Sequence, residues 1–273
     1  MKLAVGVVLY NPSYEEIDNI NSYIKNIDTV LIYDNSKDDH SVLVNNVLKD
    51  RNYEYFYNGC NDGISKSFNY IFSVAKDIKI DYVLLLDQDS VIESGQINNI
   101  KATINKNKSF NYCLNVCFNK ISKTNPDTVL FAITSGMIVN TKFYLSNGGY
   151  DEKLFIDGVD HDYCIRLLKL GEPIYLIKDA HLKQRLGSGE KNFLGVYEHS
   201  AMRNYYIFRN RLYLINKHRD YYTLDKKIRF FYLSIAKQVL SIIISEKYKF
   251  EKLKYLVIAF RDYKNEKFGK LEW

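Results

Sequence analysis

Residues 83–91 read Val83-Leu84-Leu85-Leu86-Asp87-Gln88-Asp89-Ser90-Val91. Four apolar residues lead directly into two aspartates that are separated by one residue. Because successive side chains of a strand point to opposite faces, Asp87 and Asp89 point the same way at the strand's end. A continuous apolar run is typical of a strand buried on both faces, and open α/β sheets bind ligands at the carboxyl ends of such strands. The stretch therefore predicts an α/β fold with an acidic site at the sheet edge.

Two carboxylates at this position suit Mg²⁺ or Mn²⁺. These cations prefer hard oxygen ligands and share their coordination shell with water and phosphate oxygens, so the implied partner is a diphosphate. Asp-x-Asp is a short pattern, and acidic pairs also cap helices and solvate turns. Taken alone, the pair leaves both interpretations open.

The composition is typical of a globular protein with a full core, since 47% of the 273 residues are hydrophobic and 26% are charged. The amino terminus reads as a first strand without a signal-peptide cleavage site, and no apolar run reaches the ~18 residues of a membrane span. We therefore expect a cytoplasmic enzyme. Four cysteines, Cys60, Cys113, Cys117 and Cys164, form no disulfide framework and no zinc motif, which predicts buried free thiols.

Basic residues are concentrated near the carboxyl terminus. Residues 203–273 contain 17 Lys or Arg against 7 Asp or Glu, a net charge of +10, whereas residues 1–202 carry a net charge of −4. Apolar residues recur there at helical spacing, at Ile228, Phe231, Leu233, Ile235 and Val239. A basic amphipathic helix favours anionic lipid headgroups over nucleic acid, and a solvated helix packed on the core fits the pattern equally well. Peripheral membrane contact is therefore one of two open expectations for this region, and no nucleic-acid partner is expected.

Strand-like and helix-like segments alternate before Asp87. The expected strands are Val5–Tyr10, Thr29–Tyr33, Tyr53–Tyr57 and Asp81–Leu86. A capping box, Ser13-x-x-Glu16, opens the first helix, and Asn61-Asp62-Gly63 opens another. This alternation predicts a parallel, doubly wound sheet. After residue 110 the pattern loosens, with strand-like segments at Tyr112–Phe118, Val129–Thr134 and Ser135–Val139.

The chain has three prolines and no Gly/Ser-rich hinge. One α/β domain over residues 1–215 is therefore expected, followed by a basic amphipathic helical extension over residues 216–273.

Further motifs follow in a fixed order: Val8-Leu9-Tyr10-Asn11-Pro12, Asp34-Asn35-Ser36, Asn61-x-Gly63-Ile64-x₄-Asn69, Asp87-Gln88-Asp89-Ser90, Thr134-Ser135-Gly136, Gly148-Gly149-Tyr150-Asp151-Glu152, Phe155-Ile156-Asp157-x₂-Asp160-x-Asp162-x₃-Arg166 and His199-Ser200-x₂-Arg203-x-Tyr205-Tyr206-x₂-Arg209-Asn210. Each motif is weak alone. Together they resemble family 2 glycosyltransferases of the GT-A type, above all bacterial rhamnosyltransferases. The resemblance covers most of the chain. It implies a GT-A fold, which is Rossmann-like with a mostly parallel central sheet and helices on both faces, plus a helical carboxyl-terminal extension.

The resemblance also implies that the first half holds a nucleotide. Tyr10 is expected to stack on the base, and Asp34 to accept a hydrogen bond from the imide N–H of uracil or thymine. Asn61 and Gly63 are expected to form a turn close to the nucleotide, where glycine lets the backbone approach. Asp87 is expected to face the ribose or to act through water.

Asp89 is expected to bind Mg²⁺ or Mn²⁺ directly, so that the cation neutralises charge on the diphosphate leaving group. Arg209, together with Arg203, is expected to clamp the same diphosphate, because a guanidinium offers a planar array of donors. The alternative for both arginines is an ion pair within the tail or a contact with lipid.

Asp160 matches the carboxylate that serves the family as the base for the acceptor hydroxyl. Burial by Phe155 and Ile156 is expected to raise its pKa toward the useful range. Many relatives have Glu-Asp at this point, whereas this chain has Val159-Asp160, so one acidic candidate is missing.

Asp162 and Asp157 are the alternative bases, and Arg166 is expected to orient them by an ion pair. Asp162 and Arg166 also fit a helix cap and a pair across one helical turn. Ser135 and Gly136 are expected to support the acceptor or the site.

The stretch Gln184-Arg185-Leu186-Gly187 departs from the His-x-x-Gly that relatives often have. Gln184 can hydrogen-bond a phosphate or a hydroxyl but cannot carry charge. His181 lies three positions earlier and is a possible substitute, although a lone histidine is more often structural. The roles of both stay open.

The implied activity is an inverting, metal-dependent transfer of L-rhamnose from dTDP-L-rhamnose to a growing, lipid-linked cell-surface polysaccharide. Transfer from another sugar nucleotide, such as a UDP-hexose or a galactofuranose donor, fits the same motifs, and so does a non-catalytic sugar-nucleotide-binding module. The apolar run and Asp-x-Asp also resemble the nucleophile motif of haloacid-dehalogenase-type phosphohydrolases. That motif normally opens its domain, whereas three strand-like segments precede Asp87 here.

Overall fold

The computed structural model describes residues 1–49, 51–93, 95–116, 120–183 and 198–272. The chain forms two compact units, of which the first comprises residues 1–151 and 159–185 and the second comprises residues 152–158 and 186–273. Helix α7 (Ala201–Lys217) belongs to the second unit. The proposed boundary after residue 215 stays a prediction.

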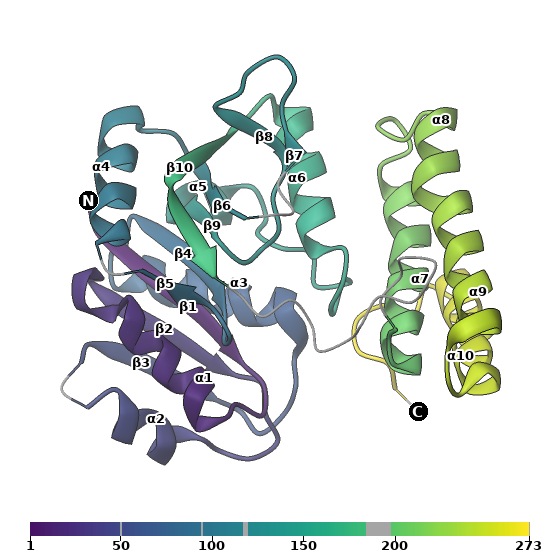
Figure 1. Ribbon diagram of the computed structural model, residues 1–273, viewed down its shortest axis with the longest axis horizontal. Coiled ribbons are helices and arrows are strands. Elements are labelled where there is room, and N and C mark those ends of the chain that lie inside the picture. The colour runs from purple at the N-terminus through teal and green to yellow at the C-terminus, as the bar shows by residue number, and fades with distance from the viewer. Residues whose placement is uncertain (50, 94, 117–119, 184–197, 273) are drawn as a thin grey trace. The chain divides into compact units, whose positions relative to one another are not determined.

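Four parallel strands form one half of the sheet in the first unit (Figure 1). They are β1 (Leu3–Leu9), β2 (Thr29–Asp34), β3 (Tyr53–Tyr57) and β4 (Tyr82–Asp87), in the order β3-β2-β1-β4. The register pairs Leu9 with Asp34. It also pairs Val8 with Asp87, so the carboxyl ends of β2, β1 and β4 lie side by side.

Helices cover both faces of these strands. The helices are α1 (Tyr14–Asp18), α2 (Ser41–Val47), α3 (Gly63–Asp77) and α4 (Gln96–Asn107). Val5 and Val7 of β1 share a buried cluster with Ile17 of α1 and with residues of α2 and α4. On the opposite face, a Cβ added at Gly6 would lie 2.9 Å from Ile71 Cγ2 of α3. The predicted doubly wound arrangement is confirmed for this half.

The predicted capping box at the start of α1 is also confirmed. Ser13 Oγ accepts a hydrogen bond from the Glu16 N–H at 3.2 Å, and Glu16 Oε2 accepts one from the Ser13 N–H at 2.8 Å. Helix α1 has only five residues, and 3₁₀ turns at Asn19–Ser22 and Ile24–Asn26 follow it.

The other half of the sheet is mixed. It contains β5 (Val91–Ile92), β6 (Asn111–Asn115), β7 (Lys120–Ile121), β8 (Thr128–Phe131), β9 (Met137–Asn140) and β10 (Ile174–Lys183), with α5 (Thr141–Ser146) and α6 (Val159–Leu170). Strand β9 runs antiparallel to β4 and β6, while β6 runs parallel to β10. The strand predicted to begin at Ser135 begins at Met137, since Gly136 has a φ of +90° and interrupts the extended backbone.

Two of the cysteines confirm the predicted buried thiols. Cys113 and Cys164 are free and buried, and burial raises the pKa of each thiol to about 12. Cys60 is free but exposed, so the prediction is wrong for that residue. Cys117 lies outside the described residues.

The second unit is helical, as predicted for the carboxyl-terminal region. Besides α7 it contains α8 (Leu224–Lys227), a π-helical turn (Ile228–Leu233), α9 (Ser234–Ser245) and α10 (Lys249–Lys264). Helix α10 packs against α7 and α9. Of the predicted apolar face, Leu233 is exposed, and Ile235 and Val239 are half-buried. No helix among the described residues has the length and hydropathy that a membrane crossing requires.

Candidate active site

Hydrogen bonds tie together the loops that follow β1, β2 and β3. The Asn11 N–H donates to Ser36 Oγ at 2.7 Å, which joins the first loop to the second. Asn35 Oδ1 accepts from the Asp62 N–H at 3.0 Å, and Asn35 Nδ2 donates to the Gly63 carbonyl at 3.4 Å. The start of α3 is thereby held at the carboxyl edge of the sheet.

The predicted turn at Asn61 and Gly63 is present at this edge. Asn61 Oδ1 accepts a hydrogen bond from the Gly63 N–H at 2.9 Å, and Gly63 has a φ of +81°, which only glycine adopts at little cost. Gly63 begins the 15-residue helix α3, whose amino-terminal N–H groups favour a nearby anion.

Asp34 is fully buried at the end of β2 and organises its own loop. Its Oδ1 accepts a hydrogen bond from the Ser36 N–H at 2.9 Å, and its Oδ2 accepts one from Tyr55 Oη at 2.7 Å. The same Oδ2 lies 2.9 Å from His40 Nδ1. These contacts use most of the carboxylate's acceptor capacity. Tyr55 and His40 lie in no recognisable motif and were not predicted as neighbours of Asp34. The base-binding role of Asp34 stays a prediction.

Tyr10 stands at the carboxyl end of β1, and 54% of the residue is exposed. Its N–H donates to Gln88 Oε1 at 2.7 Å, and Gln88 Nε2 donates to its carbonyl at 3.4 Å. Gln88, the middle residue of the Asp-x-Asp motif, therefore binds the loop after β1, and its spacing in the motif does not predict this contact. The exposed ring is compatible with stacking on a base.

Asp87 and Asp89 are both half-buried at the end of β4. The Asp87 N–H donates to Ser135 Oγ at 3.2 Å, and that hydroxyl lies 3.2 Å from Ser90 Oγ. The Gly136 N–H donates to the Leu85 carbonyl at 2.7 Å. The structure thus brings Ser135 and Gly136, two predicted supporting residues, against the acidic end of β4.

The described residues contain no group of three or more His, Cys, Asp or Glu that could hold a metal ion. Mg²⁺ is often held by only one or two carboxylates together with substrate phosphates, and that arrangement needs no such group. The half-buried carboxylates of Asp87 and Asp89 fit a cation that is shared with a diphosphate. They do not fit an all-protein cage.

Asp160 lies in the first turn of α6, and its side chain is 24% exposed. Its Oδ1 accepts a hydrogen bond from the His161 N–H at 2.8 Å and lies 3.2 Å from His161 Nδ1. Burial acts to raise the pKa of Asp160, but the hydrogen bonds and charge of His161 outweigh it and lower the pKa below its ordinary value. The predicted raised pKa is therefore wrong, because a neighbouring donor dominates.

Helix α6 contacts residues 132–135, and the same segment contacts the acidic end of β4. Cys164, one turn after Asp160, contacts the backbone of Ala132 with its sulfur at 3.5 Å from both the nitrogen and the oxygen. Ser135 lies three residues after Ala132, and its Oγ accepts a hydrogen bond from the Asp87 backbone N–H. Asp160 and Asp87 are thus connected through residues 132–135 of one compact unit.

Asp162 and Arg166 stabilise the protein around the Gly148-Gly149 turn. Asp162 is fully buried, and Arg166 Nε donates to its Oδ2 at 2.9 Å. The same guanidinium donates to the backbone carbonyls of Asn147 and Gly149. The interpretation of these residues as a pair across one helical turn is confirmed, and we do not propose Asp162 as a base.

Arg209, Arg203 and Asp157 belong to the second unit. Arg209 is fully buried, and its guanidinium donates to Tyr205 Oη at 3.1 Å and to the Gly269 carbonyl at 2.9 Å. These contacts indicate a structural role, so we do not propose Arg209 as a diphosphate ligand. Arg203 is exposed and lies 3.2 Å from Asp157 Oδ1.

Gln184 lies outside the described residues. His181 is exposed near the end of β10, and its backbone N–H donates to Gln96 Oε1 at 2.7 Å. The role of its ring stays open.

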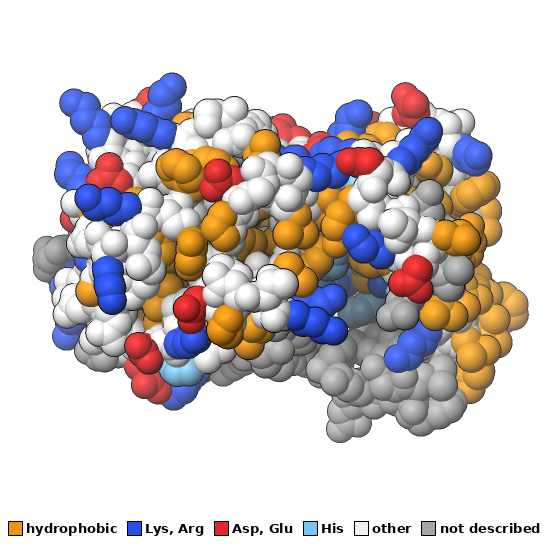
Figure 2. All heavy atoms as spheres, turned by 90° about the horizontal axis from the view of Figure 1, so that it is seen from above, with side chains coloured by type: hydrophobic (Ala, Val, Ile, Leu, Met, Phe, Trp, Pro, Cys, Tyr) orange, Lys and Arg blue, Asp and Glu red, His pale blue; other side chains and the backbone are white. Residues whose placement is uncertain are grey.

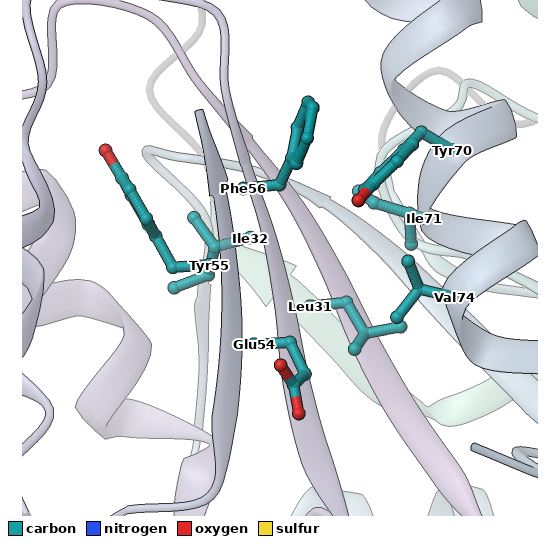
Figure 3. A pocket seen from close by; sticks show the side chains of 8 residues that line it. All are labelled: Leu31, Ile32, Glu54, Tyr55, Phe56, Tyr70, Ile71 and Val74. Atoms are coloured by element: carbon teal, nitrogen blue, oxygen red, sulfur yellow. The ribbon is translucent and has the colours of Figure 1, made fainter. Parts of the chain in front are cut away.

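A cavity of about 130 Å³ lies between β2, β3 and α3 (Figure 3). Its lining residues are Leu31, Ile32, Glu54, Tyr55, Phe56, Tyr70, Ile71 and Val74. The rings of Phe56 and Tyr70 are 4.1 Å apart between centroids. A second cavity of about 190 Å³ is lined by residues of β8 and α6 and by those that follow α6. Neither cavity is lined by Asp87, Asp89 or Asp160, so both are separate from the acidic strand end.

Comparisons with known proteins agree with this arrangement. The family model described as glycosyl transferase family 2 matches residues 13–164. The dTDP-rhamnosyl transferase RfbF of Shigella flexneri is 28% identical over 288 aligned residues, which cover 94% of this chain and 93% of that protein.

Two solved structures have the same GT-A fold. S. aureus TarS 1–349 in complex with UDP-GlcNAc matches with a TM-score of 0.60 and 16% identity, over 96% of this chain and 80% of that chain. GalNAc-T7 with UDP, GalNAc and Mn²⁺ matches with a TM-score of 0.64 and 12% identity, over 97% of this chain and 56% of that chain. Because the family model spans more than half of the residues, the chain belongs to glycosyl transferase family 2 and is a glycosyltransferase.

Proposed function

We propose that the chain transfers L-rhamnose from dTDP-L-rhamnose to a hydroxyl of a growing cell-surface polysaccharide, with inversion at the anomeric carbon. The observation that carries this proposal is the similarity to a dTDP-rhamnosyl transferase along nearly the full length of both proteins. We further propose that the acceptor is lipid-linked and that transfer occurs on the cytoplasmic face of the cell membrane.

The carboxyl edge of β2, β1 and β4 is the proposed donor site. Tyr10 offers its exposed ring to the base, and the network around Asp34 and Asn35 holds the loops against the nucleotide. The turn at Asn61 and Gly63 lets the backbone approach the donor, as its geometry supports.

Asp89, with Asp87, would hold Mg²⁺ or Mn²⁺ together with the donor's diphosphate. When bound, the cation would supply Lewis-acid neutralisation of the charge on the leaving diphosphate. Ser135 and Gly136 support this edge, because Ser135 Oγ accepts from the Asp87 backbone and orients the end of β4.

Asp160 is the proposed base. Its lowered pKa keeps it ionised at neutral pH, so it can accept the proton of the acceptor hydroxyl as that oxygen attacks the anomeric carbon. His161 then has a positioning role, since its backbone N–H holds Asp160 Oδ1.

A panel of dTDP- and UDP-sugars, assayed with Mg²⁺ or Mn²⁺ for release of the nucleoside diphosphate, tests the donor. Release from dTDP-L-rhamnose that exceeds release from every UDP-sugar supports the proposal. Preference for a UDP-hexose would replace the donor while keeping the reaction. Donor binding should be measured by calorimetry in parallel, because hydrolysis without an acceptor is slow.

Substitution of Asp160 by Asn tests the base. Loss of a general base lowers rates by about 10²–10⁴-fold, so we expect kcat of Asp160→Asn to fall by about 10³-fold while donor binding changes less than threefold. Asp127→Asn is the matched control, because that carboxylate is exposed and pairs with Lys178. Retained transfer in Asp160→Asn would exclude Asp160 as the base.

Asp89→Asn separates donor binding from base chemistry. We expect it to weaken donor binding about tenfold or more in the presence of Mg²⁺, and to have little effect when the cation is chelated. Equal weakening with and without Mg²⁺ would argue against the proposed role of Asp89.

A further inference from the structure

The turn between α9 and α10 has charged and polar groups on its inside. Lys252 and Glu246 are buried, and Lys252 Nζ lies 2.8 Å from Glu246 Oε2 and 2.8 Å from Glu198 Oε1. Ser241 Oγ, also buried, donates to Glu246 Oε1 at 2.6 Å. Burial acts to lower the pKa of Lys252, but the two carboxylates raise it overall, so the ammonium stays charged. This ion pair fixes the turn.

The outside of the same turn is apolar. Phe250 is 91% exposed, Tyr248 is 75% exposed and Val257 is 70% exposed. Ile243 and Ile244, at the end of α9, are each about half exposed. In Figure 2, hydrophobic side chains gather on the surface of the unit that carries α9 and α10, with lysine and arginine among them. We name the surface of Ile243, Ile244, Tyr248, Phe250 and Val257 the hairpin tip.

Basic side chains surround the hairpin tip. Lys249 Nζ donates to the Ile243 carbonyl at 2.7 Å, which places an ammonium at the end of α9. Lys254 and Val257 follow Phe250 by four and seven residues, so all three lie along one face of α10, and Lys254 is exposed. Lys247, also exposed, lies in the turn itself.

The hairpin tip therefore exposes several large apolar side chains close together, with basic residues around them. Large apolar side chains gathered on a protein surface mark an interaction site, and basic residues around them favour an anionic partner. Helix α10 packs against α7 and α9, yet these side chains stay exposed. We propose that the hairpin tip binds the surface of an anionic bilayer, with Phe250 and Val257 at the boundary between headgroups and acyl chains and the lysines on lipid phosphates. This proposal rests on the proposed function, because an enzyme gains from binding the membrane when its acceptor is lipid-linked.

Vesicle co-sedimentation of the full chain tests this proposal without donor or acceptor. The probes are vesicles of phosphatidylcholine alone and of phosphatidylcholine with phosphatidylglycerol. We expect strong binding only to the anionic vesicles, weakened by salt. Val257→Ser and Phe250→Ser should each lower the partition coefficient about tenfold, since each removes one inserted apolar side chain. The matched control Val42→Ser, at a position that is 74% exposed in the first unit, should bind as the wild type does.

A double charge reversal, Lys247→Glu with Lys254→Glu, should lower binding to anionic vesicles by about tenfold or more. Equal losses in Val257→Ser and Val42→Ser would overturn the proposal, as would equal binding to neutral and anionic vesicles. A stable wild-type dimer that Phe250→Ser converts to a monomer, without loss of vesicle binding, would instead identify the hairpin tip as an interface between two copies. Asp160→Asn must bind vesicles normally, so a failure of the catalytic proposal is distinguishable from a failure of this one.

Discussion

The two compact units differ in the charged side chains that they bury and in the apolar side chains that they expose. In the first unit, strands such as β4 bury apolar side chains completely, and the polar residues of the candidate site stand at the sheet edge. In the second unit, Lys252, Asp262 and Arg209 are buried, while Phe250 and Val257 are exposed. Both units remove apolar surface from water, and the second also buries a lysine and an arginine whose charged groups are satisfied by ion pairs and hydrogen bonds. Apolar surface left outside is available to a partner.

The largest effect that tests this comparison is expected in the first unit. Phe72 of α3 is fully buried and stacks on Tyr144 with ring centroids 3.6 Å apart. Phe72→Ala should lower the free energy of unfolding by about 3–5 kcal/mol, because it creates a cavity. Urea unfolding followed by circular dichroism measures it. The control Phe110→Ala removes a partly exposed ring that stacks on Phe143, and it should lower the free energy of unfolding by about 1 kcal/mol or less. Equal losses in the two variants would contradict the dependence on buried apolar surface.

A slightly smaller effect is expected from the buried ion pair of the second unit. Lys252→Met should lower the free energy of unfolding by about 3 kcal/mol, because it leaves Glu246 buried without its cation. The double variant Lys252→Met with Glu246→Gln should recover most of that loss, since it removes both charges. A double variant no more stable than the single one would show that the pair does not act as a unit.

The same pair predicts a dependence on high pH. The folded-state pKa of Lys252 is raised above its ordinary value of 10.5, so its stabilisation is fully present below that pH and is lost as pH rises through the folded-state pKa. The difference in stability between wild type and Lys252→Met should therefore shrink above about pH 10.5. A difference that grows with pH would have the wrong sign.

The smallest effect at neutral pH is expected at the edge of the first unit. Because the pKa of Asp160 is lowered, kcat of the wild type should not fall through protonation of Asp160 between pH 8 and pH 5, a window well above the ordinary pKa of 3.8. His161→Gln removes the ring and its charge but leaves the burial, so the pKa of Asp160 should rise and the acid limb should move to higher pH. Initial rates of transfer from pH 8 to below the ordinary pKa of 3.8 test this, and an unmoved limb in His161→Gln would show that the His161 ring does not lower the pKa of Asp160.

Much of the first half of the fold could be predicted from local sequence. The strand at Tyr53–Tyr57 was predicted to the residue, and β1, β2 and β4 to within two residues, because long apolar runs and caps are local signals. The mixed half could not be predicted in the same way. Strands β5 and β7 have only two residues each, and their pairing is set by partners far away in the chain.

Motifs in the sequence singled out several residues of the candidate site but not their neighbours. Asp87, Ser135 and Gly136 each lie in such a motif, and the structure brings them together. The contacts of Asp34 with Tyr55 and His40, by contrast, depend on how a loop closes over the end of a strand. No periodic pattern encodes such a contact.

By itself, the sequence determined the family, the alternation of strands and helices, and the acidic end of β4, because apolar periodicity and motif spacing are properties of neighbouring residues. Only the tertiary structure decided that Arg209 lies inside the second unit and that Phe250 lies outside it. Burial depends on contacts between residues far apart in the chain, and an arginine or a phenylalanine reads the same in a sequence whether it faces the interior or the solvent.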